Sequence, residues 1–216
     1  MPITCNTFRA FGAIQQVESD AIKAGLTTPN DILSVQQMFQ WCVASIIQNL
    51  IDSCDDLNGI ESAIIPLTST YFRNVFFLST YPKPSCDGGN YLDAFNAVAA
   101  AGGITYASAY PYNITKRKCD VTKNDYAVTV TAYKRVAAQQ DMINYVLNGG
   151  TLVAVIDASG MGPYKSGIFS TCTSTYANHA VQIVGVNVDE GYWIIRNSWG
   201  SWWGDKGYMK LALVRS

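Results

Sequence analysis

The stretch of sequence that decides the fold runs from residue 178 to residue 208. It begins with Asn178-His179-Ala180-Val181, continues with Gly191-Tyr192-Trp193-Ile194-Ile195-Arg196-Asn197-Ser198-Trp199-Gly200 and closes with Trp203-Gly204-Asp205-Lys206-Gly207-Tyr208. His179 is the only histidine among the 216 residues of the chain. An Asn-Ser-Trp-Gly segment lies downstream of it. Because the chain has a single histidine, any proton transfer by an imidazole is expected at His179.

This ordered stretch resembles the histidine and asparagine motifs of the papain-like cysteine peptidases. In that family a Cys thiolate attacks the peptide carbonyl, a histidine shuttles the proton, and an asparagine orients the imidazole. The resemblance implies that His179 occupies the position of the base and Asn197 that of the orienting amide. It further implies that Trp199 shields the hydrogen bond between them from water.

Further markers of the family follow in the expected order. Cys86-Asp87-Gly88-Gly89 resembles the turn that lines the substrate cleft, and Ser166-Gly167-Ile168-Phe169 resembles the turn before the histidine. The resemblance covers residues 2–42 and 86–212. It implies one α+β papain-like domain, with a helical left lobe over 1–105 and an antiparallel, barrel-like right lobe over 106–216. The residues that it places along the cleft are Gly88, Gly89, Asn90, Tyr91, Ala180 and Trp199.

The nucleophile segment departs from the family pattern Cys-Gly-Ser-Cys-Trp-Ala-Phe. The chain reads Cys5-Asn6-Thr7-Phe8-Arg9-Ala10-Phe11-Gly12-Ala13, and its Ala-Phe-Gly-Ala run sets the register. The catalytic cysteine then falls on Phe8 and the following tryptophan on Arg9. The oxyanion glutamine falls on Pro2, which has no side-chain donor. A phenyl ring cannot form an acyl-enzyme, so the resemblance predicts a pseudoenzyme that acts as a binding or structural protein.

A second register remains open. Sliding the alignment by three residues makes Cys5 the nucleophile and also aligns Phe8 and Ala10 with the family's Phe and Ala. The chain would then be an active thiol peptidase that uses Cys5 with His179 and Asn197. This register matches fewer residues and removes the disulfide partner that the family pattern gives to Cys86.

Composition excludes several other classes of function. The chain is 49% hydrophobic and 14% charged, which favours a buried globular core over disorder. Its net charge is −1 and it has no basic block, so a nucleic-acid footprint is not expected. No apolar run reaches the length of a membrane span. The expected partner is a protein or a peptide, and a larger assembly is one form that this partner could take. No cofactor is expected.

The six cysteines are even in number and compatible with three disulfides. The family pattern would pair Cys5 with Cys86, and either Cys42 or Cys54 with Cys119. Cys172 then pairs with the remaining one of Cys42 and Cys54 or stays free. Buried reduced thiols are the alternative. No metal site is expected, because the chain has no Cys-x-x-Cys pair and a single histidine.

Hydrophobic periodicity predicts helices over residues 8–25, 34–38, 91–101 and 139–148, with Ser34 as an N-cap. Strands are predicted over 126–131, 152–156, 180–184 and 192–195. Residues 43–85 read as an insertion relative to the family; it is either an elaborated lobe surface or a partner-binding face.

The chain begins at Met1 close to the nucleophile segment, and no signal-peptide pattern precedes that segment. The expected location is therefore secreted or lumenal for a mature fragment, and otherwise non-secreted.

Overall fold

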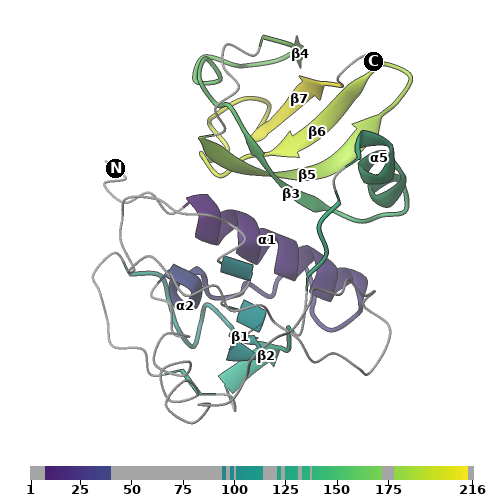
Figure 1. Cartoon of the computed structure of the whole chain (residues 1–216). Coiled ribbons are helices and arrows are strands. Elements are labelled where there is room, and N and C mark those ends of the chain that lie inside the picture. Colours follow the sequence, from purple (N-terminus) through teal and green to yellow (C-terminus); the bar gives the residue numbers. More distant parts are fainter. Residues whose placement is uncertain are drawn as a thin grey trace, which may run out of the picture. The chain divides into compact units, whose positions relative to one another are not determined.

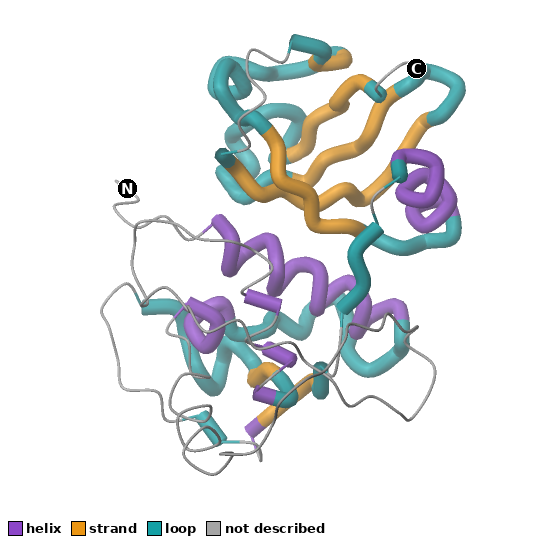
Figure 2. The backbone as a smooth tube through the Cα atoms, in the orientation of Figure 1, coloured by secondary structure: helices purple, strands orange, loops and turns teal. Residues whose placement is uncertain are grey.

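The computed structural model describes residues 8–39, 94–95, 98–99, 101–113, 121–122, 125–130, 133–136, 138–171 and 178–213. The six cysteines, Pro2, the predicted cleft residues 88–91 and the predicted insertion over 43–85 lie outside these residues, so their predicted roles stay predictions. Figures 1 and 2 show the described elements, which combine helices and strands in the α+β class.

Internal contacts divide the chain into two compact units. The first comprises Met1–Ala10 and Leu26–Arg135, and the second comprises Phe11–Gly25 and Val136–Ser216. The predicted boundary between the lobes, at residue 105, stays a prediction. Residues 11–25 belong to the second unit although they lie far from its strands in sequence, and Gly12, Gln15 and Ser19 contact Ala180 or Gln182 of the C-terminal half.

The first unit contains the helix α2 (Val35–Phe39) and the antiparallel strand pair β1 (Ile104–Thr105) and β2 (Tyr126–Val128). The Ser34 hydroxyl accepts a hydrogen bond from the Gln37 amide at 3.1 Å, which confirms Ser34 as the N-cap. The buried Gln37 side chain donates to the Gly103 carbonyl at 3.0 Å and accepts from the Thr105 amide at 2.8 Å. It therefore ties the α2 helix to β1.

The second unit is built on a five-stranded sheet. Its strands are β3 (Leu152–Ile156), β4 (Ile168–Phe169), β5 (His179–Asn187), β6 (Tyr192–Arg196) and β7 (Tyr208–Ala212), arranged in the order β3-β5-β6-β7-β4. Three neighbouring pairs are antiparallel and β4 pairs with β7 in parallel. Within the described residues the sheet is open and contains both antiparallel and parallel pairs. The predicted barrel-like lobe is therefore not a closed barrel.

The central strand β5 is buried on both faces over its first five residues. Successive side chains of a strand point to opposite faces. Val181 and Ile183 enter a hydrophobic core with Ile143 and Val146 of the α5 helix (Gln139–Leu147) and with Trp203. On the other face Ala180 and Gln182 meet the α1 helix (Phe8–Lys23), whose Gly12 lies against Ala180 and Val153.

A polar network joins the α1 helix to this second face. The Gln182 side chain is fully buried, and its amide nitrogen lies 3.0 Å from the Gln15 carbonyl oxygen, 2.9 Å from Ser19 Oγ and 3.2 Å from Thr151 Oγ1. Gln16 of the same helix donates to the Thr151 carbonyl at 2.8 Å. These hydrogen bonds fix the direction and the register of the helix against the sheet. Apolar contact alone would not fix them, because it is non-directional.

The predicted elements correspond closely to those of the structure. The predicted helix over 8–25 is confirmed as Phe8–Lys23, and that over 139–148 as Gln139–Leu147. Residues 94–95, 98–99 and 101 have helical backbone, as predicted for 91–101. The strand predicted over 180–184 extends to Asn187, because cross-strand pairing with β6 continues past an irregularity between Ile183 and Gly185.

We expect Gln182→Met to destabilise the protein by about 1–3 kcal/mol. This change keeps most of the side-chain volume but removes the buried amide group that bonds the Gln15 carbonyl, Ser19 and Thr151. Urea denaturation measures the loss. Gln140→Met is the matched control, because Gln140 is exposed and its side chain bonds Asn144 on its own helix. A Gln182→Met midpoint equal to that of the control would contradict the anchoring role.

Candidate functional site

Antiparallel pairing brings His179 and Asn197 together. His179 is the first residue of β5, and Asn197 directly follows the last residue of the neighbouring strand β6. In an antiparallel pair the start of one strand lies beside the end of the next. His179 Nε2 lies 2.8 Å from Asn197 Oδ1, so the structure brings together the two residues that the sequence singled out.

The asparagine fixes the tautomer of the imidazole. Asn197 Oδ1 also accepts the Ser198 backbone N–H at 2.8 Å, so this atom is the amide oxygen. An oxygen that faces His179 Nε2 requires the proton on Nε2, which leaves Nδ1 as the ring nitrogen that carries the lone pair in the neutral form. The Asn197 backbone N–H donates to the Gly207 carbonyl at 2.9 Å and holds the amide in place.

The pair is buried against the aromatic core. His179 and Asn197 are each 6% exposed. The imidazole and the Trp199 ring have centroids 5.0 Å apart, and Trp199 meets Trp203 edge-to-face at 5.1 Å. Trp203 is fully buried and donates its indole N–H to the Met161 carbonyl at 3.1 Å. Trp199 therefore packs against the imidazole, and its implied role in shielding the hydrogen bond from water stays a prediction.

Burial lowers the pKa of His179 below its ordinary value of 6.5, because the imidazolium loses hydration there. The hydrogen bond to Asn197 acts in the opposite direction and raises the pKa, but desolvation is the larger effect. The neutral imidazole is therefore the stable form at pH 7. A neutral imidazole with a fixed tautomer can act as a proton acceptor.

The loop that joins β6 to β7 spans residues 197–207 and contains several residues with left-handed backbone. Gly200, Gly204 and Gly207 have positive φ, and Lys206 is the one non-glycine residue of the described chain that does, at 53°. A side chain at Gly204 would collide with the Tyr208 carbonyl oxygen. The glycine spacing of the closing motif therefore follows from backbone conformation in this loop.

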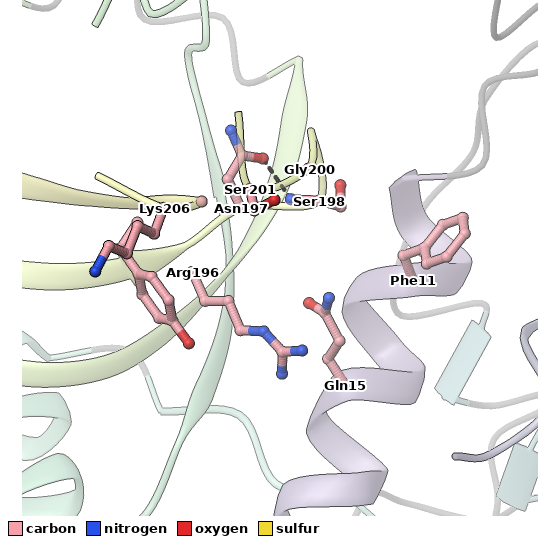
Figure 3. A pocket seen from close by; sticks show the side chains of 10 residues that line it. Phe11, Gln15, Arg196, Asn197, Ser198, Gly200, Ser201 and Lys206 are labelled. Atoms are coloured by element: carbon pink, nitrogen blue, oxygen red, sulfur yellow. Dashed lines mark hydrogen bonds between the residues drawn. The ribbon is translucent and has the colours of Figure 1, made fainter. Parts of the chain in front are cut away.

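A pocket of about 370 Å³ lies between the α1 helix and this loop (Figure 3). The sequence singled out only Asn197 among its lining residues. The others include Phe11 and Gln15 from α1, and Arg196, Ser201 and Lys206 from the β6 end and the loop. Arg196 and Lys206 stand in the motifs quoted above, but those motifs do not signal a pocket, because Phe11 and Gln15 join them only through the packing of α1 on the sheet.

The remaining predicted residues have the following places. Phe8 is the first residue of α1, Trp199 is partly exposed, and Ala180 is 3% exposed beneath Gly12. Among the described residues no cluster of His, Cys, Asp and Glu has the makings of a metal site. No helix in the described part of the chain has the length and apolar character to span a bilayer.

The site is thus a buried imidazole–amide pair, covered by a tryptophan, at the end of a sheet that packs on a long helix. The family model described as papain family cysteine protease matches residues 74–216. The chain belongs to the papain family of cysteine proteases. The match leaves out residues 1–73, which include Phe8, and it includes residues 74–85 of the predicted insertion.

Curated relatives and solved structures agree with this assignment. The chain is 35% identical over 131 residues to the viral cathepsin of Adoxophyes honmai nucleopolyhedrovirus, covering 59% of this chain and 39% of that protein. It is 41% identical over 134 residues to vignain of Phaseolus vulgaris, covering 58% and 37%. The chain thus matches about two fifths of the length of these relatives.

The bromelain protease of Ananas comosus, solved in complex with the E64 inhibitor, superposes with a TM-score of 0.68. It shares 27% identity, and the superposition covers 98% of this chain and 82% of that one. The digestive procathepsin L2 proteinase of Tenebrio molitor larvae gives 0.68 with 26% identity, covering 97% and 56%. These neighbours confirm the α+β papain-like fold.

We expect the single imidazole resonance of the protein to titrate with a midpoint below 6.5 in a proton NMR pH series. Asn197→Leu should lower the midpoint further, because it removes the hydrogen bond that favours the charged ring. The unfolded chain binds a proton first as the pH falls through 6.5, so the His179 contribution to stability is present above that pH and is lost below it. A midpoint above 6.5, or a rise in Asn197→Leu, would contradict this assignment.

Proposed function

We propose that this papain-family chain has lost peptide hydrolysis and acts as a binding or structural protein. The observation that carries the proposal is the residue at the start of the α1 helix. The helix begins at Phe8, and the Ala10-Phe11-Gly12-Ala13 run places the family's nucleophile at that position. A helix N-terminus favours a thiolate through its dipole, and here that position carries a hydrocarbon ring.

Two neighbouring substitutions support the same conclusion. In this register Arg9 replaces the family's tryptophan, and Pro2 replaces the glutamine that donates to the oxyanion. Loss of an oxyanion donor alone costs about 10²–10³ in turnover, and loss of a nucleophile costs roughly a millionfold. A site that lacks all three groups has no remaining route to an acyl-enzyme through position 8.

The retained His179–Asn197 pair is compatible with this proposal. Both side chains are buried, hydrogen-bonded to each other and packed on the Trp199–Trp203 aromatic pair. Their removal would leave buried polar groups unpaired, which destabilises a protein whether or not it is an enzyme. The proposed partner is a protein or a peptide, and co-purification of the tagged chain from its native source would identify it.

An active peptidase that uses Cys5 is the rival function, and a peptidyl epoxide warhead separates the two. We expect no labelling of the wild-type protein under conditions that label an active papain-family protease to one equivalent. Mass spectrometry of the intact protein and of its peptides gives the readout. His179→Ala and Cys5→Ser are the controls. Stoichiometric labelling of Cys5 that disappears in His179→Ala would establish the rival function.

Restoring the thiol alone should recover little activity. We expect Phe8→Cys to remain at least roughly a hundredfold below an active relative in hydrolysis of a fluorogenic peptide, because Arg9 and Pro2 still impair the site. The triple change Phe8→Cys, Arg9→Trp and Pro2→Gln is the matched comparison and should exceed the single variant. Activity in Phe8→Cys equal to that of the triple variant would show that positions 2 and 9 do not limit the chemistry.

A further inference from the structure

We propose that the pocket around Arg196 is a binding site for an oxyanion, a carboxylate or a phosphate group carried by a small molecule or a peptide. This inference concerns the face of the sheet that carries Gln182. It does not depend on whether the chain hydrolyses peptides.

Strand register determines which way Arg196 faces. Arg196 pairs with Gln182 on β5 and with Tyr208 on β7, so these three residues form one cross-strand row. Gln182 contacts the α1 helix, and alternation along β6 places Arg196 on that same face. Figure 3 shows the Arg196 guanidinium extending from the sheet toward Gln15 of the helix.

The pocket is lined by hydrogen-bond donors and by positive charge. Arg196 contributes a guanidinium and Gln15 an amide, and Ser198 and Ser201 carry hydroxyls. Lys206 is a second cationic residue of the lining, although its amino group extends away from Gln15 in Figure 3. None of the described lining residues is an aspartate or a glutamate. The carboxylate nearest in sequence, that of Asp205, belongs to an exposed residue outside this lining. Such a surface is complementary to an anion.

The Arg196 guanidinium makes no hydrogen bond or ion pair within the part of the chain that the structure describes. Arg196 is nevertheless partly buried. A cation that has lost part of its hydration without gaining a partner is destabilising, and a bound anion would offset that cost. The planar fork of a guanidinium matches carboxylate and phosphate oxygens in bidentate geometry.

Asn197, another residue of the lining, carries a second polar group. Its side-chain nitrogen is buried and has no hydrogen-bond partner among the described residues, and in Figure 3 it points away from the Arg196 guanidinium. Lys206 is held in the left-handed conformation, where few non-glycine residues are found. The pocket volume of about 370 Å³ lies within the range of roughly 300–1,000 Å³ typical of ligand sites, so it has room for a group larger than a single ion.

Titration of the ¹⁵N-labelled protein with inorganic phosphate, and separately with acetate, tests the proposal in a low-chloride buffer. We expect saturable shifts of the backbone amides of Gly200, Ser201 and Gly207 with at least one anion. Arg196→Gln should weaken that binding by roughly tenfold or more. The two anions distinguish a phosphate site from a carboxylate site, and saturation by either one supports the proposal.

Arg135→Gln is the matched control, because it makes the same charge change at an exposed arginine outside the pocket. It should bind as the wild type does. Arg196→Lys and Lys206→Asn guard against an effect of misfolding: the former keeps the charge, and asparagine tolerates positive φ. Each should give a native amide spectrum and intermediate affinity. Linear shifts without saturation for both anions, or equal affinity in Arg196→Gln and the wild type, would overturn the assignment.

Discussion

The second unit depends on a strand that must be buried on both sides. β5 packs Val181 and Ile183 into the core beneath α5, and Ala180 and Gln182 against α1. A strand in this position has no solvent-exposed face on which to place a polar side chain. The one amide that it carries toward the helix must therefore find its partners within the protein. The amide nitrogen of Gln182 finds them in α1 and at Thr151, whereas its side-chain oxygen is buried without a partner among the described residues.

The same strand organises the candidate site. Its first residue is His179, and the end of its neighbour β6 supplies Asn197, so the geometry of the pair follows from antiparallel pairing. The two faces of β6 have different chemistry. One face directs Ile195 toward the aromatic core, and the other directs Arg196 toward α1. A neutral, shielded imidazole and a cationic pocket can thus occur within a few residues of each other.

Features of the fold could be predicted from the sequence where the signal lies in residues that are close together in the chain. The His179 and Asn197 pair was predicted because its motif is long and ordered, and the α1 and α5 helices because apolar residues recur at helical spacing. The Ser34 cap was predicted from a hydroxyl before a periodic segment. Each of these signals depends on neighbours in the chain.

The Arg196 pocket and the role of Gln182 could not be predicted in the same way. Gln182 reads as an ordinary polar residue within an apolar strand, and its importance depends on a helix that ends long before it in the chain. Arg196 reads as part of the asparagine motif. The face on which it lies is set by strand register, and the irregularity between Ile183 and Gly185 changes that register within β5.

The packing of the His179 imidazole on Trp199, and of Trp199 on Trp203, has an evolutionary consequence. A buried, hydrogen-bonded histidine and asparagine that pack on this aromatic pair contribute to folding as well as to any chemistry. Natural selection for folding alone is enough to preserve such residues. The presence of the histidine and the asparagine is therefore, by itself, no measure of hydrolysis.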